Sequence, residues 1–307
     1  KLKIMKTIKQ RISYAVMGLI TMGFTACTQN EDMAPTLKGQ EINATFSVGG
    51  MQTRVNTLGD GKNWEDKDKL KVSIFTDSDP GSTTVLSFNG ETWSRSGSFR
   101  WLNEYEQHTI LAVYPSDTDF GKNNLQYDLQ TDQSSEGNLK NADLITGYWH
   151  DIPRSYYVNI PMKHRMSLVT IFYEIGEYDH PNKDISNLWI CSPCNGASFR
   201  ISNDDWIMDT SNYKEPTLVY ACQTGDDGGK SFSAIIVPGS LDTSADFLKF
   251  TLDGQDYTVK LKQKTDFLEG HRYTYRLRKI GKDKVELTRI SVDDLKGWDS
   301  NNEEDLK

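Results

Sequence analysis

The feature that most constrains the fold is a long succession of short apolar stretches, each bounded by turn residues. Phe247–Leu252 and Tyr257–Leu261, for example, flank Asp253-Gly254, and Ser167–Ile175 is rich in β-branched and aromatic residues. Apolar residues at period two indicate half-buried strands, and Asp-Gly between two such runs indicates a hairpin. No segment favours a helix longer than about two turns. The sequence therefore predicts an all-β protein of the β-sandwich class.

The expected strands run along nearly the whole chain. A two-residue turn at Asn89-Gly90 predicts a hairpin, and a change of parity between Leu287 and Ile290 predicts a bulge in the last strand. We expect Ser167–Ile175 to be central to a second core. The expected strands are 41–48, 70–74, 85–88, 91–93, 108–114, 125–129, 142–149, 156–162, 167–175, 185–191, 197–201, 218–222, 231–237, 247–252, 257–261, 271–277 and 284–292.

The N-terminal residues 1–26 have the pattern of a secretory signal peptide. A basic head after Met5 is followed by the apolar run Ile12–Phe24, which is too short to span a bilayer, and by small residues before Cys27. This spacing resembles the lipobox of bacterial lipoproteins, in which the cysteine becomes the lipid-carrying N-terminus. The alternative is an ordinary signal peptide with an unrelated cysteine. Residues 27–37 are then a polar tether, and two or more acyl chains on Cys27 would anchor the protein stably.

The charge and the motifs of the chain exclude several functions. The formal net charge is −8, which argues against nucleic acid and anionic membranes as partners. The sequence lacks the nucleophile-elbow, zincin, P-loop and dinucleotide-binding patterns. Its five histidines are scattered, and acid pairs such as Asp204-Asp205 or Asp226-Asp227 are typical of solvated loops. We therefore expect no catalytic residues, no metal and no cofactor, and interpret the protein as a non-enzyme.

Three cysteines remain if Cys27 is lipidated. In an oxidising compartment Cys191, Cys194 and Cys222 are expected to form one disulfide and leave one free thiol, with the pairing open. Cys191 and Cys194 also have Cys-x-x-Cys spacing, but a redox pair requires the first cysteine at a helix N-terminus. Here a strand precedes it and a turn follows, so neither a redox role nor a zinc site is favoured.

A series of short motifs in a fixed order resembles the fimbrillin family, the lipoprotein-derived subunits of type V pili. The resemblance covers nearly the whole chain, and its best single part is Gly270 with Tyr273 and Tyr275. The motifs are the lipobox at Cys27, Thr53-Arg54, Trp64–Val72, Val113–Pro115, Asp143–Ile145, Ile160–Leu168, Ile235–Pro238, Leu268–Leu277 and Ile290–Trp298. These are signatures of a fold rather than a reactive constellation.

The resemblance implies two transthyretin-like β-sandwich domains in series, here residues 38–162 and 163–307. It also implies that a protease cuts after Arg54, that Val55 becomes the new N-terminus, and that the first strand leaves. The apolar row of that strand is Ile42, Ala44, Phe46 and Val48. An extended segment of another subunit would then fill the vacated slot by strand addition. The alternative is that Arg54 is simply a surface arginine.

One departure concerns the C-terminal tail. Family stalk subunits carry an extra C-terminal strand to donate, whereas Asp299–Lys307 has no alternating apolar row. Either Lys284–Val292 is donated, or this subunit receives a strand without donating one. The second option would place the subunit at a pilus tip, and we favour it.

The sequence thus favours an outer-membrane lipoprotein at the cell surface that becomes a fimbrial subunit for adhesion. Its partners would be other pilus subunits, the membrane through the lipid, and a glycan or protein on a host or bacterial surface. The alternative is a lipid-anchored surface glycan-binding protein that does not polymerise. A groove with exposed tryptophans would favour that alternative, whereas a detachable first strand over an apolar slot would favour the pilus subunit. The tryptophans are Trp64, Trp93, Trp101, Trp149, Trp189, Trp206 and Trp298.

Overall fold

A computed structural model describes residues 36–48, 64–174, 185–224, 231–252, 254–281 and 284–294. Within these ranges the chain is almost entirely β, with one short helix, α1 (Glu136–Asn141). The strands are β1 (Asn43–Val48), β2 (Lys69–Phe75), β3 (Ser82–Phe88), β4 (Trp93–Arg95), β5 (His108–Tyr114), β6 (Asn124–Asp128), β7 (Ile145–Asp151), β8 (Tyr157–His164), β9 (Ser167–Glu174), β10 (Ile185–Ser192), β11 (Gly196–Ser202), β12 (Asp205–Asp209), β13 (Thr217–Tyr220), β14 (Cys222–Thr224), β15 (Ser231–Ile236), β16 (Gly239–Leu241), β17 (Asp246–Leu252), β18 (Gln255–Lys260), β19 (Thr265–Phe267), β20 (His271–Gly281) and β21 (Lys284–Asp294).

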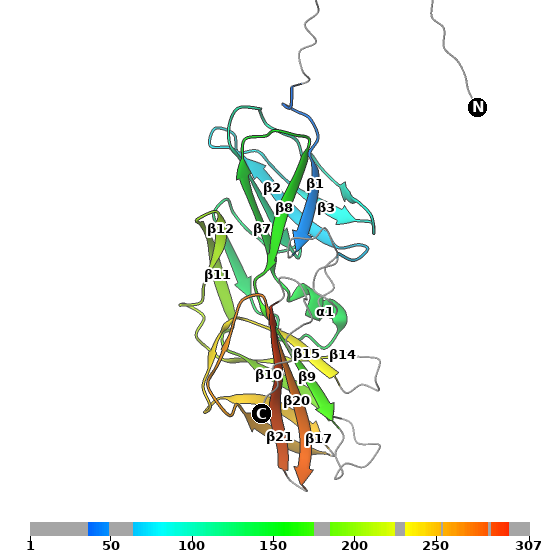
Figure 1. Cartoon of the computed structure of the whole chain (residues 1–307), viewed down its shortest axis with the longest axis vertical. Coiled ribbons are helices and arrows are strands. Elements are labelled where there is room, and N and C mark those ends of the chain that lie inside the picture. The colour runs from blue at the N-terminus through cyan, green and yellow to red at the C-terminus, as the bar shows by residue number, and fades with distance from the viewer. Residues whose placement is uncertain are drawn as a thin grey trace, which may run out of the picture. The chain divides into compact units, whose positions relative to one another are not determined.

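The strands form five sheets (Figure 1). A seven-stranded sheet has the order β1-β8-β7-β5-β2-β3-β4, and a five-stranded sheet has the order β14-β15-β9-β20-β21. The other sheets are β13-β10-β17-β18, β12-β11-β6 and the pair β16-β19. Two pairs are parallel, β1 with β8 and β9 with β20. Strand β9, which the sequence predicts to be central to a second core, is the middle strand of its sheet.

The described apolar side chains form two buried clusters. The first contains Ile42, Phe46 and Val48 of the β1 region, and the second contains most of the buried side chains of β9 to β21. Strand β5 contributes side chains to both clusters, because Ile110 lies in the first and Leu111 in the second. A strand buried on both faces reads as a continuous apolar run, as β5 does. The all-β, sandwich-like fold is thus confirmed, while the division into two domains at Met162 stays a prediction.

Two expected strand arrangements differ from the structure. Residues 218–222 do not form one strand, because β13 ends at Tyr220 and β14 begins at Cys222 in a different sheet. The hairpin after β3 pairs Phe88 with Trp93, so its loop has four residues rather than two. The Asn89 side chain explains the longer loop, since its Oδ1 accepts hydrogen bonds from the main-chain N–H groups of residues 91 and 92.

The hairpin formed by β11 and β12 is not predicted by the sequence. Ser202 pairs with Asp205 across a two-residue turn in which Asn203 and Asp204 both have positive φ. Such a turn suits this pair, since Asn and Asp tolerate the left-handed region better than most residues.

The bulge predicted in the last strand is present. In β21 the register against β20 shifts between Arg289 and Ser291. This shift confirms a bulge at Ile290.

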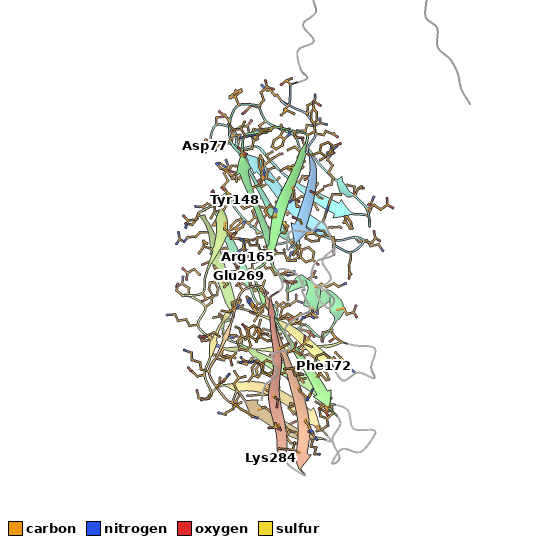
Figure 2. All side chains as sticks on the ribbon, in the orientation of Figure 1. Asp77, Tyr148, Arg165, Phe172, Glu269 and Lys284 are labelled. Carbon is orange, nitrogen blue, oxygen red and sulfur yellow. The ribbon has the colours of Figure 1, made fainter. Side chains whose placement is uncertain are left out.

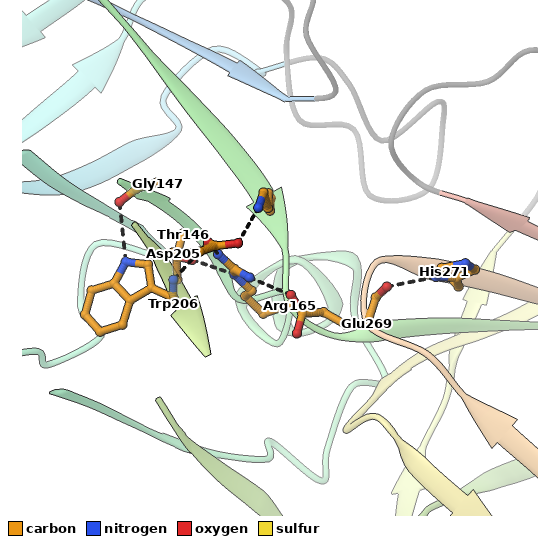
Figure 3. A network of polar contacts seen from close by, with 8 residues as sticks. Thr146, Gly147, Arg165, Asp205, Trp206, Glu269 and His271 are labelled. Carbon is orange, nitrogen blue, oxygen red and sulfur yellow. Dashed lines mark hydrogen bonds and ion pairs between the residues drawn. The ribbon is translucent and has the colours of Figure 1, made fainter. Parts of the chain in front are cut away.

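The short link between β8 and β9 is held by a buried arginine (Figure 3). Arg165 Nε donates to Thr146 Oγ1 at 2.7 Å, and its two terminal nitrogens contact Asp205 Oδ1 and Glu269 Oε1, each at 2.6 Å. The arginine side chain is 3% exposed. Arg165 and Glu269 lie beside one another where the chain passes between sheets (Figure 2). Arg165 thereby joins β7, β12 and the turn before β20 to this link.

Candidate functional site

Strand β1 lies at the edge of the seven-stranded sheet, beside β8 (Figure 1). It pairs with β8 in parallel register, from Asn43 opposite Tyr157 to Val48 opposite Met162. Just before β1, the Ile42 amide N–H donates to the Phe99 carbonyl at 3.0 Å. Among the described strands only β8 pairs with β1, so the departure of β1 would separate no other described strand pair of that sheet.

The four apolar residues of the first strand lie on its core face. Ile42, Phe46 and Val48 are at most 3% exposed, and Ala44 packs partly buried against the same cluster. The Phe46 ring contacts Trp93 edge-on, with the ring centroids 5.2 Å apart. Burial of each large apolar side chain of this kind stabilises the folded state by about 1.5–3 kcal/mol. Departure of the strand would therefore leave an apolar slot that favours refilling.

The opposite face of β1 is polar and is matched by a single side chain of β8. Asn159 Oδ1 accepts from Thr45 Oγ1 at 3.1 Å, and Asn159 Nδ2 donates to Ser47 Oγ at 3.1 Å. The slot thus has an apolar floor and, on β8, an amide that can both donate and accept. A strand that replaces β1 would be selected by alternating apolar and small polar residues.

The outer edge of β1 is met by Trp64, a contact that the sequence did not predict. Trp64 Nε1 donates to the Phe46 carbonyl at 2.9 Å, and its ring contacts Trp93 and Tyr114 edge-on. Trp64 is 2% exposed. The only signal in the sequence is the position of an aromatic residue just before the second strand. Trp64 follows Arg54 in the chain, so it would remain after the proposed cleavage and offer its N–H to a replacing strand.

Next to Trp64, Asp68 gives this region a dependence on pH. Burial raises the pKa of the Asp68 carboxyl to about 6, helped by the charge of Glu65 and opposed by a hydrogen bond from the Glu65 main chain and by Lys140. Because the folded pKa lies above the ordinary value of 3.8, the protonated carboxyl favours the folded state. Its contribution is complete below the ordinary pKa and is lost as the pH rises through about 6.

We therefore expect Asp68→Asn to be more thermostable than the wild type at neutral pH, with the difference shrinking as the pH falls to about 4. Asparagine keeps an acceptor for the Glu65 N–H, which lies 2.7 Å from Asp68 Oδ2. The measurement is the melting temperature of both proteins across this pH range. Asp66→Asn, at an exposed position of the same turn, is the matched control. Parallel pH profiles for Asp68→Asn and the wild type would contradict the assignment.

The remaining maturation residues of the sequence prediction cannot be placed. Cys27, Arg54 and Val55 lie outside the described residues, as does the segment that joins β1 to Trp64. Lipidation, cleavage and strand departure therefore stay predictions. In the described ranges, no helix has the length and apolar character required to cross a membrane.

The expected disulfide is not formed in the structure. Cys191, Cys194 and Cys222 are all buried free cysteines. Each thiol contacts a main-chain carbonyl, of Ser192, Pro238 and Gln223 respectively, and Cys191 and Cys222 belong to different sheets. Burial raises the pKa of all three thiols, that of Cys191 to about 11. Raised thiol pKa values are the opposite of what a redox pair requires.

His164, one of the scattered histidines, and Asp205, one member of an acid pair, both have structural partners. His164 is 5% exposed, and its Nδ1 lies 3.0 Å from Asp143 Oδ1. Burial alone would raise the pKa of Asp205, but hydrogen bonds and charges from Lys163 and Arg165 outweigh it and lower that pKa. Among the described residues no three His, Cys, Asp or Glu side chains are grouped as metal ligands. These contacts indicate that His164 and Asp205 have structural roles.

Most of the described tryptophans belong to the cores. Trp64, Trp101 and Trp206 are buried, and Trp93 and Trp149 pack against the first cluster. Trp189 differs, because it is half-buried on β10 and lines a groove. Trp298 lies outside the described residues.

Comparisons with known proteins agree with this architecture. A family model described as fimbrillin-like matches residues 53–294. A candidate cell adhesion protein from Bacteroides ovatus has a similar structure, with a TM-score of 0.59, 13% identity, and coverage of 84% of this chain and 98% of that one. A second, from Bacteroides uniformis, gives 0.58 and 17%, with coverage of 83% and 96%. Among curated protein sequences, none matches the chain.

Proposed function

The chain belongs to the fimbrillin-like family, and from this premise we propose that it is a pilus subunit for adhesion that another subunit completes by strand addition. The observation that carries the proposal is the edge strand β1, which pairs only with β8 in its sheet and covers an apolar slot. A vacated slot of this kind presents unpaired main-chain groups of β8 and a row of apolar contacts. An extended segment of another subunit would satisfy both.

Processing after Arg54 would remove β1 and keep the rest of the slot. The family match begins at Thr53, so it covers the part of the chain that such a cut would leave. Trp64, Trp93 and Asn159 all follow Arg54 in the sequence and line the slot from three directions. The mature subunit would thus retain the three described side chains that now contact the Phe46 ring, the Phe46 carbonyl and the polar face of β1.

The N-terminal segment supplies the route to the cell surface in this proposal. Lipidation of Cys27 would hold the precursor at the outer membrane until cleavage frees the subunit. An uncut chain would remain anchored. The tip position in the filament stays a prediction of the sequence.

The experiment is to determine the N-terminus of the protein by mass spectrometry, on whole cells and in material sheared from the surface. We expect acylated Cys27 in the cell fraction and Val55 in the sheared fraction. Arg54→Ala should abolish the form that begins at Val55. Arg154→Ala is the matched control, because that arginine is 78% exposed in another loop and should not affect processing.

Detection of the acylated Cys27 form alone, in both fractions, would overturn strand exchange by this route. An anchored binding protein would then be the better interpretation. Sheared material that begins at Val55 in the Arg54→Ala variant would also contradict the proposed site, because the cut would not depend on that arginine.

A further inference from the structure

The sheet formed by β13, β10, β17 and β18 has an outer face that the strand-exchange proposal does not use. A groove of about 470 Å³ lies on it, with a lining that includes Asn187, Trp189, Lys249, Thr251, Asp256 and Thr258. This volume is within the range of small-ligand sites. No lining residue belongs to β1 or to its sheet.

The register of the four strands shows which side chains lie beside Trp189, the aromatic wall of the groove. Tyr220, Trp189, Lys249 and Thr258 are directly opposite one another across β13, β10, β17 and β18. Residues opposite one another share a face of the sheet, so these side chains form one row. Trp189 stacks on Tyr220, with the ring centroids 4.8 Å apart and the planes at 24°. Neither ring belongs to the described hydrophobic clusters, which places the stack on the outer face.

A bulge brings an amide into the same groove. The register between β10 and β17 shifts between Ser186 and Trp189, and Asn187 has a φ of +52°. The Tyr220 hydroxyl donates to Asn187 Oδ1 at 3.3 Å, which fixes the amide beside the aromatic stack. Bulges commonly redirect a side chain toward a functional surface.

The polar groups of the groove include both hydrogen-bond donors and acceptors, and the positive charge of Lys249 is balanced by the negative charge of Asp256. Thr251 Oγ1 donates to Asp256 Oδ1 at 2.7 Å, which leaves the second carboxylate oxygen as an acceptor. The Lys249 side chain is 43% exposed, and its ammonium lies at a long distance, 3.4 Å, from Asp246 Oδ2. One cation and one anion side by side disfavour a strongly charged ligand. They suit a neutral ligand that carries several hydroxyl groups.

We propose that this groove binds a neutral pyranose sugar, whose C–H face stacks on Trp189 and whose hydroxyls bond to Lys249 and Asp256. An aromatic wall provides rigid apolar area, while the surrounding donors and acceptors fix orientation. The proposal is independent of strand exchange, because the groove needs neither cleavage at Arg54 nor removal of β1.

The test is a titration of the isotope-labelled full chain, followed by NMR at the tryptophan indole N–H signals. The probes are methyl β-D-galactopyranoside, methyl α-D-mannopyranoside and methyl N-acetyl-β-D-glucosaminide, each at up to millimolar concentrations. We expect one of them to shift the Trp189 signal in a saturable manner. Trp189→Ala should weaken binding of that sugar, followed through the other signals of the groove, by about tenfold.

Two further variants separate recognition from folding. Asp256→Asn keeps the shape of the side chain and should weaken binding by about threefold, because one charged hydrogen bond becomes neutral. Trp149→Phe is the control, because Trp149 is half-buried against the first cluster and does not line the groove, so the affinity should be unchanged. The proposal is overturned if none of the three sugars shifts the Trp189 signal, or if Trp189→Ala binds with the affinity of the wild type.

Discussion

Phe46→Ala is expected to lower the free energy of unfolding of the full chain by about 3–5 kcal/mol. The ring is 2% exposed and lies edge-on against Trp93, so its removal leaves a cavity between β1 and the core. Among the described strands only β8 pairs with β1, and on the outer edge the Trp64 indole N–H bonds to the Phe46 carbonyl, so the apolar row supplies much of what holds the strand. The measurement is urea unfolding at equilibrium.

Tyr157→Ala is the matched control for this substitution. Tyr157 also carries a large ring on the same strand pair, but it is 74% exposed, so its loss should cost less than about 0.5 kcal/mol. A loss below about 1 kcal/mol for Phe46→Ala would show that β1 is not held through its apolar row. A chain that begins at Val55 lacks Phe46 altogether, so in the proposed mechanism the substitution weakens the precursor and leaves the assembled filament unchanged.

Arg165→Met is expected to destabilise the protein by about 3 kcal/mol, near the lower limit for loss of one partner of a buried ion pair. The Arg165 side chain is 3% exposed, and its guanidinium bonds Thr146, Asp205 and Glu269. The two carboxylates are 26% and 32% exposed, so water can partly replace the arginine, which keeps the loss near that limit.

Lys163→Met provides the comparison, since Lys163 pairs with the same Asp205 but is 49% exposed. An exposed pair of this kind should contribute less than about 1 kcal/mol. Asp205→Asn combined with Arg165→Met should cost less than the sum of the two single losses, because the pair is coupled. Equal losses for Arg165→Met and Lys163→Met in chemical unfolding would contradict the importance of burial.

Local patterns in the sequence predicted much of the fold. The alternation of Ile42, Ala44, Phe46 and Val48 gave the core face of β1, because period two in a strand directly sets which side chains are buried. The parity change near Ile290 gave the bulge in β21 for the same reason. These features depend on residues close together in the chain, and the structure confirms them.

The features that position the site depend on contacts between distant residues. The parallel pairing of β1 with β8 joins positions more than a hundred residues apart, as the register of Asn43 with Tyr157 illustrates. The Trp64 contact to the Phe46 carbonyl and the Arg165 cluster are equally non-local. The Asn203-Asp204 turn is local but was missed, because its pair of left-handed residues contains no glycine. Cysteine spacing likewise does not determine where the thiols lie, because the packing of distant strands places Cys191 and Cys222 in different sheets.

The link between β8 and β9 also has a mechanical consequence. Only Arg165 and Met166 separate the two strands, and β9 is central in its sheet. If a strand from another subunit takes the place of β1, tension along the filament reaches β8 through a parallel strand pair. Such a pair is loaded in shear, so its hydrogen bonds share the force instead of opening one after another. The force then passes along the main chain of Arg165 and Met166 into β9, and the contacts of the Arg165 side chain to Thr146, Asp205 and Glu269 would brace this link under tension.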